Sequence, residues 1–93
     1  MKLIKTANYK KANTSDGYDP YRCDFNAEAQ KSSQWDDDQL AYAFMDATEA
    51  SKGANGGKYT DQLSVYHTEA KNRGWSRNQI LAAQAAGKFH PIN

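Results

Sequence analysis

The chain has 93 residues, with 12 Lys and Arg against 11 Asp and Glu, and a formal net charge of +1 at pH 7. This length predicts a single domain, 1–93, and the near-zero charge gives no support to a strongly basic nucleic-acid binder or to an acidic DNA mimic. A single cysteine, Cys23, excludes an intrachain disulfide, and no apolar run reaches the length of a membrane span, so we expect a cytoplasmic protein without membrane contact.

Residues 1–34 are predicted to form an irregular N-terminal arm. The stretch 10–20 is rich in Asn, Ser, Asp and Gly, which favour turns, and only residues 26–31 have the composition of a short helical turn. The tyrosines and the phenylalanine of this arm are compatible with two interpretations of its role. Either the arm lies along the rest of the chain through these rings, or it becomes ordered when a partner binds.

A helix is predicted for residues 36–52, because Asp36 and Gln39 have the spacing of a capping box and Trp35 can pack on Leu40 as a hydrophobic staple. The three aspartates at its start favour the positive end of the helix dipole, so we interpret them as a cap and not as a metal site. Apolar residues at helical spacing then form one stripe: Leu40, Ala43, Phe44 and Ala47.

A second helix is predicted for residues 60–73, antiparallel to the first, with an inner face of Leu63, Tyr66 and Ala70. The glycine-rich loop between the two helices lacks the spacing of a nucleotide-binding loop. Tyr59 stands where such a loop needs Ser or Thr for magnesium, so we interpret the loop as a hairpin connection.

A third helix is predicted for residues 77–86. Trp75, Ser76, Gln79 and Ile80 repeat the aromatic residue, cap, glutamine and aliphatic residue that begin the first helix. The predicted fold class is therefore all-α, a three-helix arrangement with an irregular arm. Its parts are the arm (1–34), the helical hairpin (35–73), and the third helix with a tail (74–93).

The second and third helices also resemble the helix-turn-helix family over residues 66–86. Its small residue, turn glycine and core positions fall on Ala70, Gly74, Trp75, Ile80 and Ala83. The resemblance implies a DNA-binding regulator whose nucleic-acid-binding residues are Ser76, Arg77, Asn78 and Gln79. Glu69 and Arg73 depart from the pattern, since the family buries apolar side chains there. A plain turn between two core helices is the alternative.

We expect neither a metal ion, a cofactor nor catalysis. Cys23, His67 and His90 are the only soft or borderline metal ligands, and no two of them lie within four residues of each other, as zinc ligands usually do. A cysteine–histidine pair would need a local nucleophile motif, and none is present.

A binding surface is the remaining interpretation, because six tyrosines and two tryptophans exceed what a small core needs. The residues expected to contact a partner, most simply a protein, are Tyr18, Tyr21, Arg22, Tyr42, Met45 and Arg77. A nucleic acid and a second copy of the chain are the alternative partners.

Residues 40–73 resemble small helical-hairpin accessory proteins of tailed bacteriophages. The residues that carry this resemblance are Leu40, Asp46, Ala47, Glu49, Ala50, Gly57, Lys58, Tyr59, Asp61, Gln62 and the stretch 69–73. It implies a non-catalytic protein that binds a host or phage macromolecule and inhibits a host enzyme or defence complex. A small structural or assembly subunit of a virion, packed through the alanine-rich third helix, is a further alternative.

Overall fold

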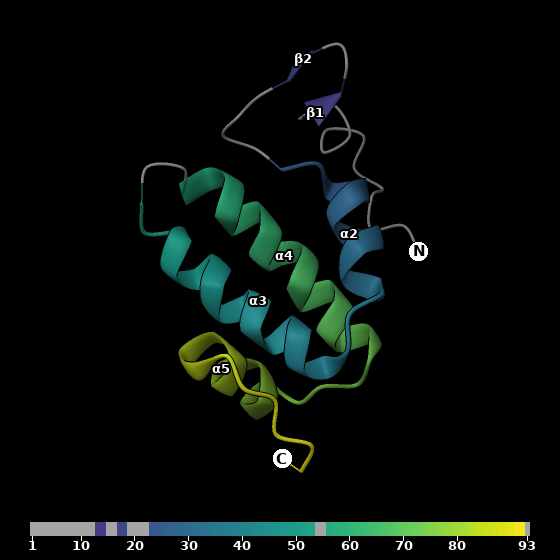
Figure 1. Cartoon of the computed structure of the whole chain (residues 1–93), viewed down its shortest axis with the longest axis vertical. Helices are drawn as coiled ribbons and strands as arrows, with labels where there is room; N and C mark the ends of the chain where they lie inside the picture. Colours follow the sequence, from purple (N-terminus) through teal and green to yellow (C-terminus); the bar gives the residue numbers. More distant parts are fainter. Residues whose placement is uncertain (1–12, 15–16, 19–22, 54–55, 93) are drawn as a thin grey trace.

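Helices form most of the chain in the computed structural model, which describes residues 13–14, 17–18, 23–53 and 56–92 (Figure 1). In the described ranges the helices are α2 (Phe25–Ser33), α3 (Asp37–Ala50), α4 (Gly56–Asn72) and α5 (Arg77–Ala86). Two strands of two residues each, β1 (Asn13–Thr14) and β2 (Gly17–Tyr18), pair antiparallel, with Asn13 opposite Tyr18.

The helices are arranged in the order α2, α4, α3, α5 across the molecule (Figure 1). The hairpin of α3 and α4 forms the centre, α2 packs against α4, and α5 packs against α3. The all-α prediction is thus confirmed. The prediction of three helices is wrong, because α2 lies inside the segment that was expected to be irregular.

The local chemistry of α2 explains why it forms. The Asp24 carboxylate accepts a hydrogen bond from the backbone N–H of Ala27 at 3.1 Å, which caps the first turn. Phe25, Ala29 and Ser32 are spaced by four and three, so they lie on one face of the helix, where Phe25 and Ser32 are buried. This face needs α4 to cover it, so the helix depends on a tertiary contact.

Both predicted capping boxes are present. Gln39 N–H donates to Asp36 Oδ1 at 2.8 Å, and Asp36 N–H donates to Gln39 Oε1 at 2.9 Å. At α5, Gln79 N–H donates to Ser76 Oγ at 3.1 Å, and Ser76 N–H donates to Gln79 Oε1 at 2.7 Å. The first and third predicted helices therefore begin where the sequence indicates.

The second predicted helix begins earlier than expected, at Gly56 instead of residue 60. A Cβ atom at Gly56 would lie 2.7 Å from the carbonyl oxygen of Ser51, so only glycine permits this close approach. The loop between α3 and α4 is correspondingly short.

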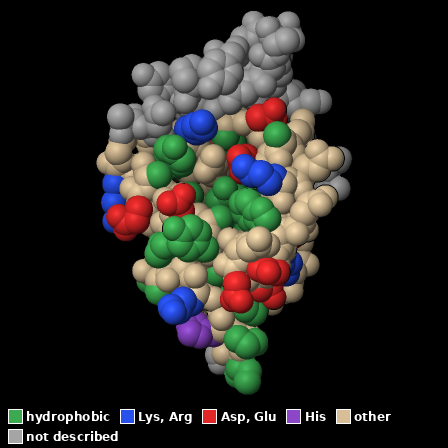
Figure 2. Space-filling model, viewed as in Figure 1, with side chains coloured by type: hydrophobic (Ala, Val, Ile, Leu, Met, Phe, Trp, Pro, Cys, Tyr) green, Lys and Arg blue, Asp and Glu red, His purple; other side chains and the backbone are tan. Residues whose placement is uncertain are grey.

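The core gathers around Phe44, which is fully buried. Its ring centroid lies 5.3 Å from that of His67, and 5.9 Å from those of both Tyr66 and Trp75. Because α4 lies between α2 and α3, it buries Val65 as well as the predicted Tyr66 and Ala70. Hydrophobic side chains on the face in Figure 2 form separate patches with charged side chains between them.

Candidate functional site

The turn between α4 and α5 is held by the guanidinium group of Arg73. Its Nε donates to Glu69 Oε2 at 2.8 Å and its Nη1 donates to Asp37 Oδ1 at 2.9 Å. Its Nη2 donates to the carbonyl oxygens of Ser32 (3.0 Å) and Trp35 (2.7 Å), at the end of α2 and in the link to α3. One side chain therefore joins α2, α3 and α4.

The charge of Arg73 is balanced inside this network. Burial alone lowers the pKa of Arg73, but the hydrogen bonds that Arg73 donates to Glu69 and Asp37, with the charges of these carboxylates, outweigh burial and raise the pKa above its ordinary value. Asp37 Oδ1 also accepts from Trp75 Nε1 at 3.2 Å. The two departures from the helix-turn-helix pattern, Glu69 and Arg73, thus stabilise the fold as an ion pair, and they are not offered to a ligand.

A second polar contact joins α2 to α4. The hydroxyl of Tyr66 donates to Glu28 Oε1 at 3.2 Å, and Glu28 Oε2 lies 3.2 Å from Lys31 Nζ. Burial and then the Glu28 charge raise the pKa of Tyr66. This tyrosine is therefore a core residue with its polar partner supplied by α2.

A groove of about 460 Å³ lies between α4 and α5 and is the best candidate for a binding site in the described part of the chain. Its residues come from α4, from the turn and from α5: His67, Lys71, Trp75, Arg77, Ile80, Leu81 and Gln84. Trp75 and Ile80 are buried, whereas Leu81 is 47% exposed. Lys71 and Arg77 are exposed, so two cationic side chains line the groove together with its apolar residues.

Helical spacing explains why these side chains share one groove. His67 and Lys71 are four residues apart on α4. The α5 members follow Arg77 at three, four and seven residues, which is one face of a helix. Gly74, with a φ of 83°, provides the left-handed turn that brings the two faces together.

The electrostatics of the groove are one-sided. No acidic residue lines it, and neither Lys71 nor Arg77 forms an ion pair with any residue in the described ranges. Burial, and then the charge of Lys71, lower the pKa of His67 and so disfavour its charged form. The groove therefore presents two positive charges, an imidazole and an amide around apolar side chains.

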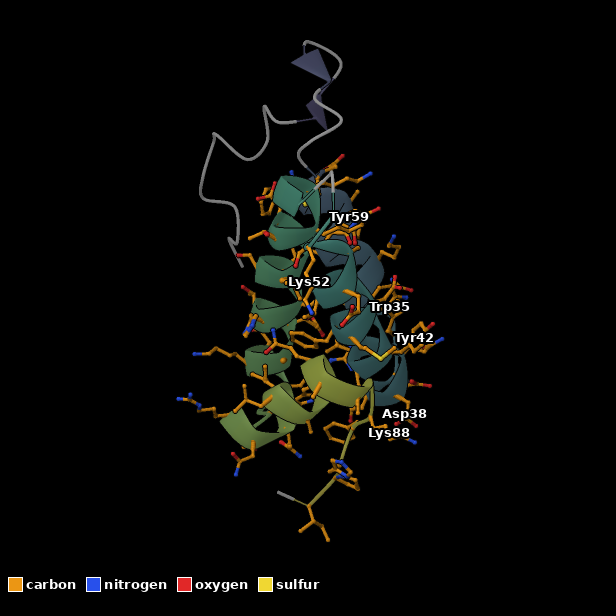
Figure 3. The ribbon with its side chains drawn as sticks, turned by 90° about the vertical axis from the view of Figure 1, so that its left-hand side faces the viewer. Trp35, Asp38, Tyr42, Lys52, Tyr59 and Lys88 are labelled. Carbon is orange, nitrogen blue, oxygen red and sulfur yellow. The ribbon has the colours of Figure 1, made fainter. Side chains whose placement is uncertain are left out.

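The structure separates the residues predicted to contact a partner. Tyr21 and Arg22 lie outside the described residues, and Tyr18 belongs to β2, where only the backbone is described. Tyr42 is 58% exposed on α3, at the same edge of the molecule as Asp38 and Lys88 in Figure 3.

Met45, which belongs to α3, lies beside the C-terminal end of α5, whereas Arg77 lies at the N-terminal end of α5. The Met45 side chain packs on Gly87 at the α5 C-cap, where a Cβ atom would lie 3.1 Å from its sulfur. Arg77 begins the same helix, which has 10 residues and is about 15 Å long. Of the predicted contact residues with described side chains, Arg77 alone lines the groove.

Of the four predicted nucleic-acid-binding residues, two are used in the helix cap and two are exposed. Ser76 and Gln79 form the capping box, and Gln79 is 8% exposed because its Nε2 donates to the carbonyl oxygen of His90 at 2.6 Å. Arg77 and Asn78 are exposed. The cap therefore uses two of the four side chains.

The groove residues other than Arg77 were missed as a site at the sequence level. The signal that could have found them is the exposed apolar Leu81 at four residues from Arg77, on a helix without any acidic side chain.

The described ranges contain neither a cluster of metal-ligand side chains nor a membrane-spanning helix. No group of three or more His, Cys, Asp or Glu side chains there is placed to hold a metal ion. Cys23 is buried, and its backbone N–H donates to Asp61 Oδ2 at 3.3 Å. None of the described helices has the length and apolar content needed to cross a membrane.

Comparison with protein-family models, with curated proteins and with solved structures found no match to the chain.

Proposed function

We propose that this chain is a non-catalytic protein-binding module that contacts its partner through the groove between α4 and α5. The observation that carries the proposal is the exposed Leu81 on a floor of Trp75 and Ile80, flanked by Lys71 and Arg77. Aromatic, large aliphatic and arginine side chains are the typical centre of a protein interface.

The contacts that hold Trp75 in place support the same function. Trp75 is held from below by Phe44, from the tail by Phe89 at 4.6 Å, and at its Nε1 by Asp37. A floor that is already ordered loses little conformational entropy when a partner binds, which favours affinity. The partner belongs to the class that the phage resemblance implies, a host or phage macromolecule, and inhibition of a host enzyme or defence complex is the consequence proposed.

Photocrosslinking tests this function with the full chain. A photoreactive phenylalanine analogue replaces Leu81 in the groove, and in a matched control it replaces Ser64, an exposed residue of α4 that does not line the groove. We expect a covalent protein adduct from position 81 in bacterial cells and none from position 64. Equal adducts from both positions, or none from position 81, would contradict the proposal.

A DNA-binding regulator is the second candidate, favoured by one observation. Ala70, Trp75, Ile80 and Ala83 are buried and Gly74 has a positive φ, as the helix-turn-helix spacing requires. Against it, the cap uses two of the proposed base contacts, and the acidic run 36–38 lies at the same turn through the contacts of Asp37.

Titration with duplex DNA separates the two candidates. A DNA-binding protein would shift a duplex at low salt, with an affinity that falls steeply as salt rises and that drops in Arg77→Ala. The protein-binding proposal expects no salt-sensitive shift of a duplex at concentrations where a protein adduct forms.

A further inference from the structure

We propose that the groove between α4 and α5 binds an acidic segment of a partner protein in which an apolar side chain lies beside carboxylates. This inference rests on the proposed function and specifies the chemistry of the partner. Its basis is the pattern of charge around the groove, the exposure of Leu81 and the size of the cavity.

The two cations of the groove, Lys71 and Arg77, form no ion pair with any residue that the structure describes. At four residues before and after Lys71, where a helical neighbour could supply a carboxylate, the chain has His67 and Trp75. At four residues after Arg77 it has Leu81, and α5 contains no acidic residue.

Three other cations are paired, whereas Lys58 and Lys88 form no ion pair with a residue in the described ranges. Lys31, Lys52 and Arg73 each lie within 3.4 Å of a carboxylate oxygen. Glu69, the acidic residue nearest to Lys71 in the sequence, is bonded to Arg73. Carboxylates from a partner are therefore the complementary groups for Lys71 and Arg77.

The apolar side chains of the groove favour a partner segment that carries an apolar side chain as well as carboxylates. Leu81 remains about half exposed in the groove that the two cations also line, together with the buried side chains of Trp75 and Ile80. Removing this surface from water favours binding of an apolar group at the same place. A cavity of about 460 Å³ holds a few side chains, which suits a short segment of a partner.

A protein segment fits this site better than a nucleic acid. Two cations neutralise few phosphates, whereas affinity for a duplex grows with the number of phosphates neutralised. The Asp37 carboxylate lies against Trp75 and Arg73 at the edge of the same turn, and the exposed Asp36 and Asp38 flank it. None of these aspartates lines the groove, so their charge opposes a duplex that extends past the groove more than a short segment confined to it.

Binding of defined peptides to the full chain tests the inference. In the variant Trp35→Phe, Trp75 is the only tryptophan of the sequence, so tryptophan fluorescence reports on the groove floor. The probe is a short peptide with a central leucine flanked by glutamates, compared with peptides that carry glutamine or lysine for glutamate, or serine for leucine. Amide chemical shifts of the labelled protein locate the contact.

We expect the glutamate–leucine peptide to shift the amides around Lys71, Arg77 and Leu81. Replacing either its glutamates or its leucine is expected to weaken binding about tenfold or more. The double variant Lys71→Glu, Arg77→Glu is expected to lose binding of the glutamate peptide and to bind the lysine peptide instead. The matched double variant Lys52→Glu, Lys58→Glu makes the same change of net charge outside the groove and is expected to bind like the parent protein.

The outcomes separate the two proposals. If position 81 captures a protein but the peptides bind without regard to charge, or if both double variants behave alike, the inference is wrong and the proposed function stands. If the peptide shifts map to another surface, the inference is also wrong. Thermal unfolding of each variant confirms that its fold is retained, as expected for exposed lysine and arginine side chains without ion pairs in the groove.

Discussion

Replacing Arg73 with alanine removes four hydrogen bonds. Three of them join the end of α4 to α2, α3 and the link between them, and the fourth joins Arg73 to Glu69 within one turn of the chain. The side chain of Arg73 is only 18% exposed, so water replaces these bonds incompletely. We expect the variant to fold with the same helices but with a markedly lower free energy of unfolding.

The magnitude follows from the environment of each partner. A hydrogen bond from a charged donor contributes about 1.5–3 kcal/mol, and a buried carbonyl left without a partner costs about 1–3 kcal/mol. The bond to Asp37 counts for less, because this carboxylate is 42% exposed and screened by water. Incomplete burial and non-additivity make the total smaller than the sum of these contributions. We expect Arg73→Ala to lower the free energy of unfolding by about 3–4 kcal/mol. The whole chain of 93 residues is stable by about 5–14 kcal/mol.

Urea denaturation followed by circular dichroism measures this loss, with Arg77→Ala as the control. Arg77 is exposed and forms no ion pair with the described residues, so its loss is expected to change the free energy of unfolding by less than about 0.5 kcal/mol. Arg73→Lys keeps the charge without the planar fork and is expected to lose about half as much as Arg73→Ala. A result in which Arg73→Ala and Arg77→Ala are equally stable would refute the reasoning.

Three further predictions concern the core, the caps and pH. Phe44→Ala is expected to lower the free energy of unfolding by about 3–5 kcal/mol, because a fully buried ring at the centre of the core is removed; a loss below about 1 kcal/mol in urea denaturation would contradict the described packing. Asp36→Ala and Ser76→Ala are each expected to cost about 1 kcal/mol through loss of a capping box, whereas Ser64→Ala, on the exposed side of α4, is expected to be neutral or slightly stabilising. The lowered pKa of His67 means that the unfolded chain binds more protons than the folded chain below about pH 6.5. Stability from this group is therefore complete above that pH and falls as the solution is acidified; urea midpoints at pH 7 and pH 5 should differ less in His67→Gln than in the parent protein, and an equal difference would argue against burial of the neutral imidazole.

Short-range signals in the sequence predicted the parts of the fold that depend on neighbouring residues. The capping boxes at Asp36 and Ser76 and the left-handed Gly87 at the end of α5 are local, so spacing alone located α3 and α5. Only a short helical turn, 26–31, was predicted where α2 forms, because the segment follows a turn-rich stretch and the buried face of the helix is stabilised by α4.

Long-range contacts could not be predicted in the same way. The partners of Arg73 at Ser32, Trp35 and Asp37 are 36 to 41 residues away in the sequence, and Tyr66 finds Glu28 at a separation of 38. The groove likewise needs the turn at Gly74 to bring two helix faces together. Of its residues, only Arg77 was predicted as a contact, because arginine is recognisable by type whereas Leu81 matters through its place in the groove.

The most direct measurement of the central claim is the identity of what a photoreactive side chain at position 81 captures in bacterial cells. We expect a discrete protein adduct that disappears when Lys71 and Arg77 are both replaced by glutamate. Capture of nucleic acid, or an adduct indifferent to that double replacement, would contradict the claim that this groove binds an acidic protein segment.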